Sequence, residues 1–312
     1  MGEHDVVVIG GGAAGLSAAL VLSSARRGVA VVDAGNPRNA PAAHMHGYLS
    51  RDGLPPRDLL EAGRAEIVAY GGQLPTGTVS AVSGTTESGF EVLLEDGLSA
   101  RRLLVATGLR DELPEVAGLW ARWGRDVLHC PYCHGYEVRD QRLGVLGGSA
   151  ESVAHALLIA QSTDVVYFAH TTDLSDEQNE QLVARGVGVV EGTVARVVAE
   201  DDELCGLEMA DGRVVERAAM FVRPRFVPNS HLAVGLGCVV DADGWVTADN
   251  VGSTSVAGVW VAGNAANPRA QVITAAGEGS AAAIALNAEL VDEDVAQQVR
   301  RHRLGVAVAG RA

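Results

Sequence analysis

The sequence contains no lysine, so all 24 of its basic residues are arginines. Without lysine the chain cannot form a Schiff base with a carbonyl substrate, and it lacks the lysine of a phosphate-binding P-loop. Its 39 acidic residues outnumber the arginines and give a net charge of −15. Because binding to a nucleic-acid backbone requires a basic face, we expect no nucleic-acid partner.

Cysteines are few and long apolar runs are absent. Four cysteines in 312 residues are too few for the disulfide framework of a secreted protein. The sequence contains no run of about 18 apolar residues, the length needed to span a membrane. Its N-terminus enters a strand without the charged segment of a signal peptide. We therefore expect a cytoplasmic protein with no membrane partner, in which a close pair of cysteines is catalytic or binds a metal.

Three strand–turn–helix segments organise the chain. The first has a strand over residues 5–9, a glycine turn, a helix ending near Ser24 and a strand over residues 29–33. The second begins near Leu143 and the third at Gly258. This order predicts an α/β protein with two doubly wound, Rossmann-like domains, the second inserted into the first. The expected first domain covers residues 1–113 and 247–312, and the expected second domain covers residues 114–246.

A capping box marks one helix of the second segment. Ser175 is followed three residues later by Gln178. A serine side chain in this position accepts a hydrogen bond from the backbone of the first helical turn, and the glutamine bonds back to the serine backbone. The pattern predicts that a helix begins after Ser175.

The first glycine turn has the spacing of a dinucleotide-binding site. Gly10, Gly12 and Gly15 follow a strand and open a helix, and Asp33 stands 18 residues after Gly15 at the end of the next strand. The glycines let the backbone approach a pyrophosphate at the helix N-terminus, and the carboxylate accepts hydrogen bonds from a ribose. Because FAD and NAD share this motif, it does not choose between them.

The stretch HCPYCHGYE, residues 129–137, places two cysteines three positions apart between two histidines. A metal site would use both thiolates and both imidazoles. Histidines adjacent in sequence to the cysteines are poorly placed to close a tetrahedral site, and zinc sites usually bring a second pair of ligands from a distant segment. The two other cysteines, Cys205 and Cys238, are 33 residues apart. A metal site is the less favoured interpretation.

As a redox pair, Cys130 and Cys133 need only a turn, which Pro131 favours, and a nearby base. A CxxC pair at a helix N-terminus has one thiol of lowered pKa, which makes that thiol a nucleophile near neutral pH. The sequence therefore favours a redox-active disulfide.

Two further segments connect this pair to a flavoprotein family. LLVATG at residues 103–108 and GVWVAGNAA at residues 258–266 resemble the places where flavoprotein disulfide reductases return the chain to FAD. Together with WGRDVLHCPYCHG at residues 123–135, they make the sequence similar to low-molecular-weight thioredoxin reductases along nearly its whole length. The resemblance implies FAD as cofactor and a homodimer, with Cys133 facing the flavin and Cys130 exchanging with substrate.

The residues expected to act in catalysis are Cys130, Cys133 and His134, with no metal. The residues expected to contact FAD are Gly10, Gly12, Ala13, Ala14, Gly15, Asp33, Ala34, Arg38, Asn39, His46, Val82, Ala106, Thr107, Gly108, Gly263, Asn264, Gln271 and Val272.

His134 departs from the family, in which an aspartate acid follows the second cysteine. A histidine titrates near neutral pH and can take the proton of an incoming thiol, which suits oxidation of a dithiol. The alternative interpretation is that His134 only caps the turn. Upstream, Arg38 and Asn39 are expected where the chain passes FAD, and His44 or His46 could join a proton path to His134. The alternative interpretation is that they are ordinary loop residues that solvate a turn.

The second domain lacks the residues with which thioredoxin reductases bind NADPH. Ser149 and Ala150 stand where the family has glycine and aspartate, and Thr171 and Thr172 replace the arginines that bind the 2′-phosphate. Arg225 replaces a glycine close to the nicotinamide nucleotide, where we expect its side chain to fill the space. The sequence predicts that nicotinamide binding is lost. The missing arginines argue against NADPH only, because NADH has no 2′-phosphate for them to bind.

A CxxC flavoprotein without a nicotinamide donor must take its electrons from a dithiol. The sequence resembles the dithiol oxidases that close disulfides in natural products such as gliotoxin, holomycin and romidepsin. The resemblance implies a small-molecule dithiol substrate and O₂ as the acceptor, giving H₂O₂. The alternatives are a disulfide reductase that uses NADH, ferredoxin or another donor, and a flavin-bound redox sensor.

Overall fold

The computed structural model describes residues 2–161 and 164–305, and these form two compact units. The first unit contains residues 1–37, 58–109 and 228–312, and the second contains residues 38–57 and 110–227. Most of the second unit is thus inserted between parts of the first. Each unit is built around a sheet with helices packed on it, and the predicted α/β class is confirmed.

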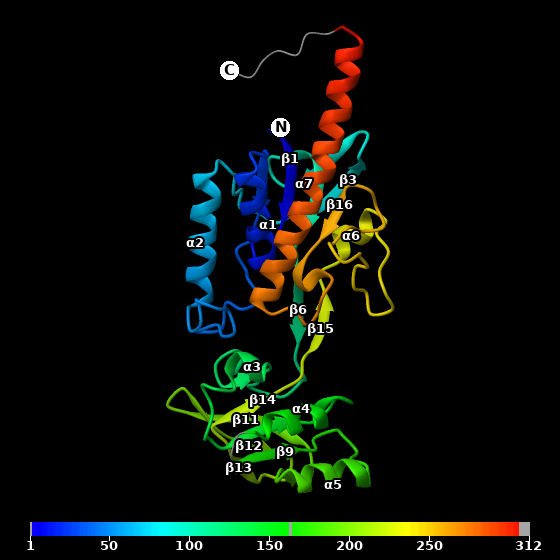
Figure 1. The fold of residues 1–312 in the computed structure, drawn as a ribbon. Helices are drawn as coiled ribbons and strands as arrows, with labels where there is room; N and C mark the ends of the chain where they lie inside the picture. The colour runs from blue at the N-terminus through cyan, green and yellow to red at the C-terminus, as the bar shows by residue number, and fades with distance from the viewer. Residues whose placement is uncertain (1, 162–163, 306–312) are drawn as a thin grey trace. The chain divides into compact units, whose positions relative to one another are not determined.

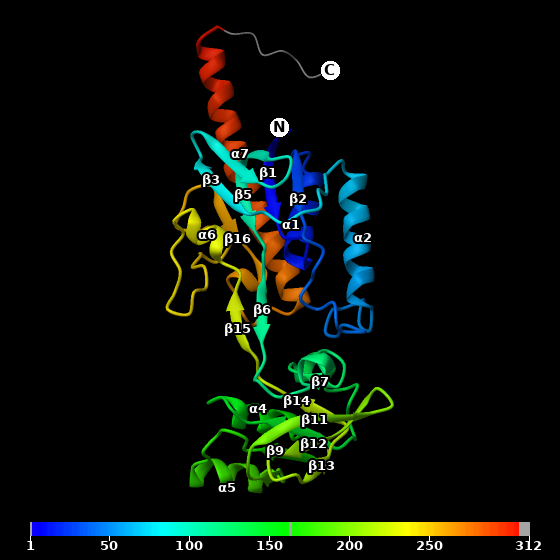
Figure 2. The same ribbon diagram turned by 180° about the vertical axis from the view of Figure 1, so that it is seen from behind.

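A six-stranded sheet forms the centre of the first unit (Figure 1 and Figure 2). Strand β1 lies between β2 and β5 and is parallel to both, and β16 pairs in parallel with β5. Strands β3 and β4 form an antiparallel hairpin at the other edge. The strands are β1 (Gly2–Ile9), β2 (Val29–Val32), β3 (Ala81–Thr85), β4 (Gly89–Leu93), β5 (Leu98–Val105) and β16 (Val259–Val261).

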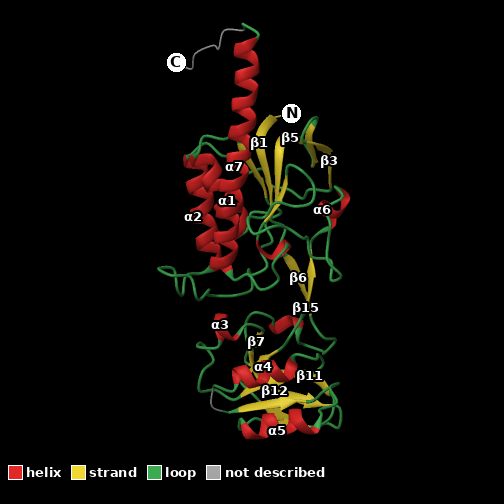
Figure 3. Ribbon diagram, turned by 45° about the vertical axis from the view of Figure 1, so that its right-hand side comes forward, coloured by secondary structure: helices red, strands yellow, loops and turns green. Residues whose placement is uncertain are grey.

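The parallel strands of this sheet are apolar on both faces because both faces are covered. Val6 and Val8 belong to the core on one face, and Val7 and Ile9 belong to the core on the other. Figure 3 shows α1, α2 and α7 gathered on one side of the sheet. The helical segments of this unit are α1 (Ala13–Ser24), α2 (Pro56–Ala69), α6 (His231–Gly235), the short 3-10 helix η2 (Gly263–Ala265) and α7 (Val272–Arg303).

Helix α7 is held by two kinds of contact. Its first half packs closely on α1, where a Cβ at Gly279 would collide with the carbonyl oxygen of Ala14. Its second half is held by ion pairs: Asp294 contacts Arg27 and Arg101, each at 2.7 Å. Beside them, Arg102 contacts Glu289 at 2.7 Å and Glu293 at 2.9 Å.

The second unit has a five-stranded parallel sheet in the order β10-β9-β8-β14-β7 and a three-stranded antiparallel sheet in the order β11-β12-β13. The parallel strands are β7 (Val127–Leu128), β8 (Leu143–Leu146), β9 (Val165–Phe168), β10 (Gly188–Val190) and β14 (Ala219–Phe221). The antiparallel strands are β11 (Val194–Glu200), β12 (Glu203–Met209) and β13 (Val214–Glu216).

Four short helical segments complete this unit: η1 (Trp120–Arg122), α3 (Pro131–His134), α4 (Ser152–Ile159) and α5 (Asp176–Ala184). The predicted capping box is confirmed at α5, where the Ser175 hydroxyl accepts the Gln178 N–H and the Gln178 side chain accepts the Ser175 N–H. Strands β6 (Leu109–Glu112) and β15 (Arg225–Pro228) pair with each other where the chain passes between the units.

The observed units and the expected domains differ at three segments, the shortest of which, residues 110–113, was expected in the first domain and groups with the second unit. Residues 228–246 group with the first unit because Leu232, Ala233 and Cys238 are part of its apolar core. Residues 38–57 group with the second unit. Residues 306–312, the end of the expected first domain, lie outside the described residues. No helix in the described part of the chain is long and apolar enough to cross a membrane.

We predict that Gly279→Ala destabilises the protein and that Gly277→Ala does not. The added methyl group at Gly279 must push α7 away from the Ala14 backbone, which should cost about 1–3 kcal/mol of unfolding free energy. At Gly277 no atom lies within 4 Å of the added Cβ, so the loss of backbone freedom should stabilise the helix by about 0.5–1 kcal/mol. Urea denaturation measures both, and equal stabilities would contradict the close helix contact.

Candidate functional site

Cys130 and Cys133 form a disulfide within a single turn of chain. Cys130 is the N-cap of α3, and its carbonyl oxygen accepts the N–H groups of Cys133 and His134, both at 3.1 Å. Pro131 occupies the first helical position, where its fixed φ angle favours the turn and its missing N–H costs nothing. Because the two sulfurs are bonded to each other, the geometry supports the redox interpretation over the metal interpretation.

Glu137 joins His134 to the upstream loop. One carboxylate oxygen, Oε2, lies 3.1 Å from His134 Nδ1, and the other, Oε1, lies 2.9 Å from His46 Nε2. On its other side, His46 Nδ1 lies 3.1 Å from Asp52 Oδ2. His44 Nδ1 lies 3.5 Å from Glu137 Oε1. The structure therefore brings the expected catalytic histidine together with both upstream histidines, through a carboxylate.

The charges in this cluster reinforce one another. The hydrogen bond to Glu137, followed by the one to Asp52, raises the pKa of His46. Burial opposes ionisation of Glu137, but the hydrogen bonds from His134 and His46 outweigh it and lower the pKa of this carboxyl group. Glu137 is therefore an anion that accepts hydrogen bonds from two imidazoles near neutral pH.

A second pair of imidazoles is buried beside the disulfide. The ring centroids of His129 and His155 are 5.5 Å apart, and His155 Nε2 donates to the backbone carbonyl of His129 at 2.8 Å. Burial lowers the pKa of each imidazole to about 4, and repulsion from His129 adds to the effect at His155. Both rings are neutral near pH 7. Their hydrogen bonds to the carbonyls of His129 and Val222 tie the segment before Cys130 to the rest of the unit.

The first glycine turn has the shape that a pyrophosphate requires. A Cβ at Gly10 would collide with the Ala106 carbonyl oxygen, and a Cβ at Gly15 would collide with the Gly10 carbonyl oxygen. At Gly12, the N-cap of α1, nothing lies within 4 Å of a Cβ position and no side chain caps the helix. The N-terminal N–H groups of α1, which include those of Ala14 and its neighbours, are therefore open to an anion.

Asp33 follows β2 and lines a cavity of about 310 Å³ in the first unit, together with Gly35 and Arg64. Its carboxylate accepts the Gly35 N–H at 3.0 Å and an Arg64 N–H at 2.7 Å. A carboxylate accepts several hydrogen bonds at once, so these contacts leave it able to accept one from a ribose. The position of Asp33 fits its expected role, and Arg64 is a partner that the sequence did not indicate.

The segment after β5 is fixed by one asparagine. Asn229 Nδ2 donates to the Thr107 carbonyl at 2.9 Å, the Asn229 N–H donates to the Gly108 carbonyl at 3.0 Å, and the Thr107 hydroxyl donates to the Asn229 carbonyl at 2.8 Å. Ala106 contacts Gly10, so the expected pyrophosphate turn and this segment meet at one place. These residues fit a cradle for FAD.

The turn after β16 is also built from hydrogen bonds. Glu278 accepts the Gly263 N–H at 2.9 Å and an Asn267 side-chain N–H at 2.7 Å. Asn264 donates its amide hydrogens to the carbonyls of Asn267 and Ala270, so its side-chain oxygen is what it can offer a flavin hydroxyl. Gln271 is the N-cap of α7, and no side chain caps the N–H groups of the first helical turn, which begins at Val272.

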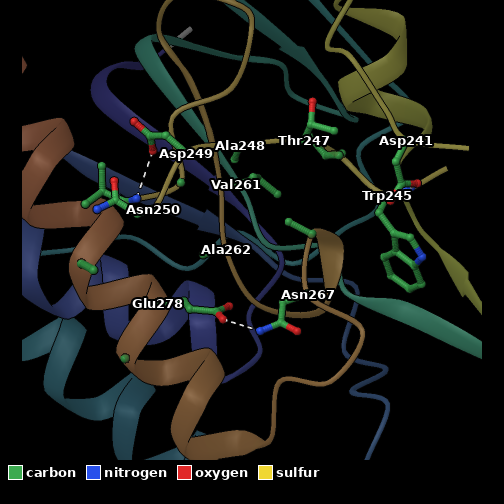
Figure 4. A pocket seen from close by; sticks show the side chains of 16 residues that line it. Asp241, Trp245, Thr247, Ala248, Asp249, Asn250, Val261, Ala262, Asn267 and Glu278 are labelled. Carbon is green, nitrogen blue, oxygen red and sulfur yellow. Dashed lines mark hydrogen bonds between the residues drawn. The ribbon is translucent and has the colours of Figure 1, made fainter. Parts of the chain in front are cut away.

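A larger cavity of about 600 Å³ lies beside this turn, between segment 241–252 and α7. Figure 4 shows Glu278 and Asn267 joined across its base, with Trp245 and Asp249 on its other walls. Its lining includes none of the residues expected at FAD. This cavity was not indicated by the sequence.

All of the expected FAD contacts stay predictions, and four of them lie outside the first-unit segments described above. Arg38, Asn39 and His46 belong to the second unit, where Arg38 forms two hydrogen bonds with Asp111, at 2.8 and 2.7 Å. Val82 lies on β3 and packs against the core of the first unit.

The glycine turn of the second unit is closed by a side chain. The Gly148 N–H, which would face a pyrophosphate in a nucleotide-binding turn, donates to the Thr172 hydroxyl at 2.6 Å. Thr172 therefore occupies a donor that a nucleotide would need. The Arg225 side chain is 71% exposed and is paired with Glu112, and its expected place in the nicotinamide space stays a prediction.

Sequence reasoning missed several residues that organise these sites. Glu137 had a usable signal, because a carboxylate three residues after a histidine lies beside it on a helical turn. Arg64, Asn229 and His155 had none, because each meets its partner only through the fold. Glu278 lies in the glycine-rich first turns of α7, where no neighbouring residue indicates its hydrogen bonds to Gly263 and Asn267.

Comparisons with known proteins agree along nearly the whole chain. A family model described as pyridine nucleotide-disulphide oxidoreductase matches residues 4–279. Thioredoxin reductase sirT of Leptosphaeria maculans is 32% identical over 94% of this chain and 96% of its own length. Thioredoxin reductase tcpT of Claviceps purpurea is 30% identical over 83% of this chain and 86% of its own length.

Solved structures give the same result. The crystal structure of HlmI has a TM-score of 0.93 and 56% identity, and the match covers 97% of each chain. The oxidoreductase from Agrobacterium tumefaciens has a TM-score of 0.87 and 34% identity over 93% of this chain and 99% of its own.

We predict that Gly12→Ala folds but retains little flavin. The added methyl group meets no atom beyond the adjacent residues, and Gly12 is the N-cap of α1, the end of the helix at which a pyrophosphate would bind. The dissociation constant for FAD, measured by titrating the apoprotein, should rise by more than about tenfold. Gly277→Ala serves as the control, and unchanged affinity in Gly12→Ala would argue against a pyrophosphate at this turn.

The buried imidazoles predict a loss of stability in acid. His129 and His155 have pKa values of about 4 when folded and near 6.5 when unfolded, so the unfolded chain binds more protons between these values. Their contribution is complete above about pH 6.5 and is lost as the pH falls towards about 4, by about 3 kcal/mol for each ring.

His129→Phe keeps an aromatic ring against Phe226 and removes one titrating group. The difference in unfolding free energy between about pH 6.5 and pH 4 should shrink by about 3 kcal/mol. Urea denaturation across this range measures it, with the exposed His231→Asn as the control. The same acid loss in His129→Phe and the parent would show that His129 is not responsible.

Proposed function

Because the chain belongs to the pyridine nucleotide-disulphide oxidoreductase family and is thioredoxin reductase-like, its cofactor is FAD, and we propose that it oxidises a small-molecule dithiol to a disulfide with O₂ as the acceptor. The proposal includes the expected homodimer and cytoplasmic location. It extends the oxidoreductase activity that the family establishes by naming the direction of electron flow, the substrate class and the acceptor.

The proposed direction of electron flow rests on the glycine turn of the second unit, where a side chain occupies a backbone donor. Thr172 holds the Gly148 N–H at 2.6 Å, and no arginine replaces the pair that thioredoxin reductases use for the 2′-phosphate. Charge-assisted hydrogen bonds to such a phosphate are worth about 1.5–3 kcal/mol each, so their absence disfavours NADPH strongly. A flavoprotein of this family without a nicotinamide donor has the dithiol as its electron source.

The chemistry at the disulfide follows from the residues around it. One substrate thiol gives its proton to His134, and the thiolate attacks Cys130, so a mixed disulfide forms and Cys133 leaves as a thiolate. The second substrate thiolate then attacks the substrate sulfur of the mixed disulfide, which closes the product disulfide and releases Cys130. Two electrons have passed from the substrate to the cysteine pair.

When bound, FAD accepts these two electrons and passes them to O₂, which takes up two protons to give H₂O₂. The overall reaction converts one dithiol and one O₂ into one disulfide and one H₂O₂. In this scheme the protein supplies the exchanging sulfurs, the base and the site that orients the substrate.

A disulfide reductase is the second candidate, because the relatives sirT and tcpT are named thioredoxin reductases. It would run the exchange at Cys130 and Cys133 in the opposite direction and would need an electron donor. The identity of the molecule that reduces the flavin separates the two candidates.

We predict that a small dithiol bleaches the flavin anaerobically, that NADPH and NADH do not, and that air restores the colour with one H₂O₂ for each dithiol oxidised. Absorbance and a peroxide assay measure this. Cys130→Ser should abolish the bleaching, whereas Cys205→Ser, the control at a partly exposed free cysteine, should not. Bleaching by micromolar nicotinamide would identify a reductase, and a reduced flavin that persists in air would contradict the oxidase.

A further inference from the structure

Glu137 makes contacts that neither a capping role for His134 nor an ordinary loop would require. Its two oxygens bind different histidines, His134 on its own turn and His46 on the loop that contains residues 44–53. We propose that Glu137 is a positioning residue, which orients His134 to take the substrate thiol proton and is itself held in place by His46. This inference rests on the proposed function and adds two residues to it.

The backbone fixes Glu137 beside His134. The N–H groups of Glu137 and Val138 both bond to the His134 carbonyl, at 3.0 and 3.4 Å, which continues the turn that begins at Cys130. The two side chains therefore lie on the same face, three residues apart. Glu137 is on the sequence segment that bears the disulfide, so it moves with the reacting sulfurs.

The loop that carries His46 is independently closed. Met45 exchanges backbone hydrogen bonds with Gly53 and Leu54, at 2.9 and 3.0 Å. Asp52 uses one oxygen for the Gly47 N–H, at 2.8 Å, and the other for His46 Nδ1, at 3.1 Å. Asp52 thereby fixes both the loop and the ring that contacts Glu137.

The hydrogen bond determines which nitrogen of His134 is available for chemistry. A carboxylate only accepts hydrogen bonds, so Glu137 selects the tautomer with the proton on His134 Nδ1 and leaves the lone pair on Nε2. The substrate thiol proton goes to Nε2, and the electron pair left on sulfur forms the new bond to Cys130 as the Cys130–Cys133 bond breaks. The imidazolium that results is stabilised by the Glu137 anion.

The solvent exposure of the side chains supports a chain that runs from His134 as the base, through Glu137 and His46, to Asp52. The His134 side chain is 15% exposed, His46 is 22% exposed and Asp52 is 65% exposed. The base is thus the most sheltered member, and the outermost carboxylate is in solvent. Among the described residues, three titratable groups contact Glu137: His134, His46 and His44. Asp52 contacts His46, and the Arg139 guanidinium lies over the Tyr136 ring.

The test follows the entry of electrons from a dithiol at the Cys130–Cys133 disulfide, in the absence of O₂ and nicotinamides, with bleaching of the flavin recorded alongside. FAD-bound protein is mixed anaerobically with dithiothreitol, and the reduction of the Cys130–Cys133 disulfide is followed by thiol trapping and mass spectrometry. Glu137→Gln should slow this step by about 10- to 100-fold near pH 7 and weaken its pH dependence, because the base loses the anion that orients it. Glu137→Asp, which keeps the charge, should recover part of the rate and the original pH dependence.

Two further variants separate positioning from folding. Glu180→Gln makes the same chemical change on the exposed surface of α5 and should leave the rate unchanged. His46→Asn removes the hydrogen bond that holds Glu137 on the side away from His134, and it should slow exchange less than Glu137→Gln does. This variant tests the proposal if Glu137→Gln fails to fold. A folded Glu137→Gln or His46→Asn with the parent rate and pH profile would overturn the proposal.

Failure of the Glu137 proposal is distinguishable from failure of the proposed oxidase function. Exchange with a dithiol involves neither O₂ nor a nicotinamide, so it reports on His134 and Glu137 whichever way electrons later flow. A flavin reduced by NADPH, or one that does not reoxidise in air, would end the oxidase proposal and leave the exchange measurement intact.

Discussion

Close contact between backbone segments at glycines is the constraint on which the first unit depends. Gly10 lies against the Ala106 carbonyl, Gly15 against Gly10, and Gly279 against the Ala14 carbonyl. Three segments far apart in the sequence therefore meet around the start of α1. A side chain at any of these positions would separate the segments, and the open space above Gly12 would no longer have its shape. The cofactor site and the core packing of this unit are one structure.

The sequence predicted what depends on neighbouring residues. The first strand–turn–helix unit, the α5 capping box and the Cys130–Cys133 pairing are all local, and all are present. What it could not predict depends on contacts made by folding. His46 and Glu137 are 91 residues apart, and Thr107 and Asn229 are 122 residues apart, so no periodicity or spacing connects them. The pairing of Arg225 with Glu112 likewise joins residues that are 113 positions apart.

The second unit has the architecture of a nucleotide-binding fold, with one N–H group of its glycine turn bonded within the protein. The five-stranded parallel sheet and its buried helix faces are intact. The turn after β8 still has the left-handed Gly148, yet its N–H is bonded to Thr172 within the same unit. Because packing maintains the sheet and only a few edge residues of such a fold contact a ligand, those residues can change while the scaffold stays folded. The disulfide-bearing turn uses the scaffold as support.

The two halves of α7 depend on different forces, and this makes the helix respond unequally to its solvent. The half around Gly279 is held by close apolar packing, which salt does not weaken, whereas Asp294 and its partners Arg27 and Arg101 attract each other as partly exposed charges. The Debye length shortens from about 10 Å at 0.1 M to about 3 Å at 1 M ionic strength, which is close to the separation of these charges. Rising salt should therefore fray the far end of α7 while the end that borders the cofactor site stays folded.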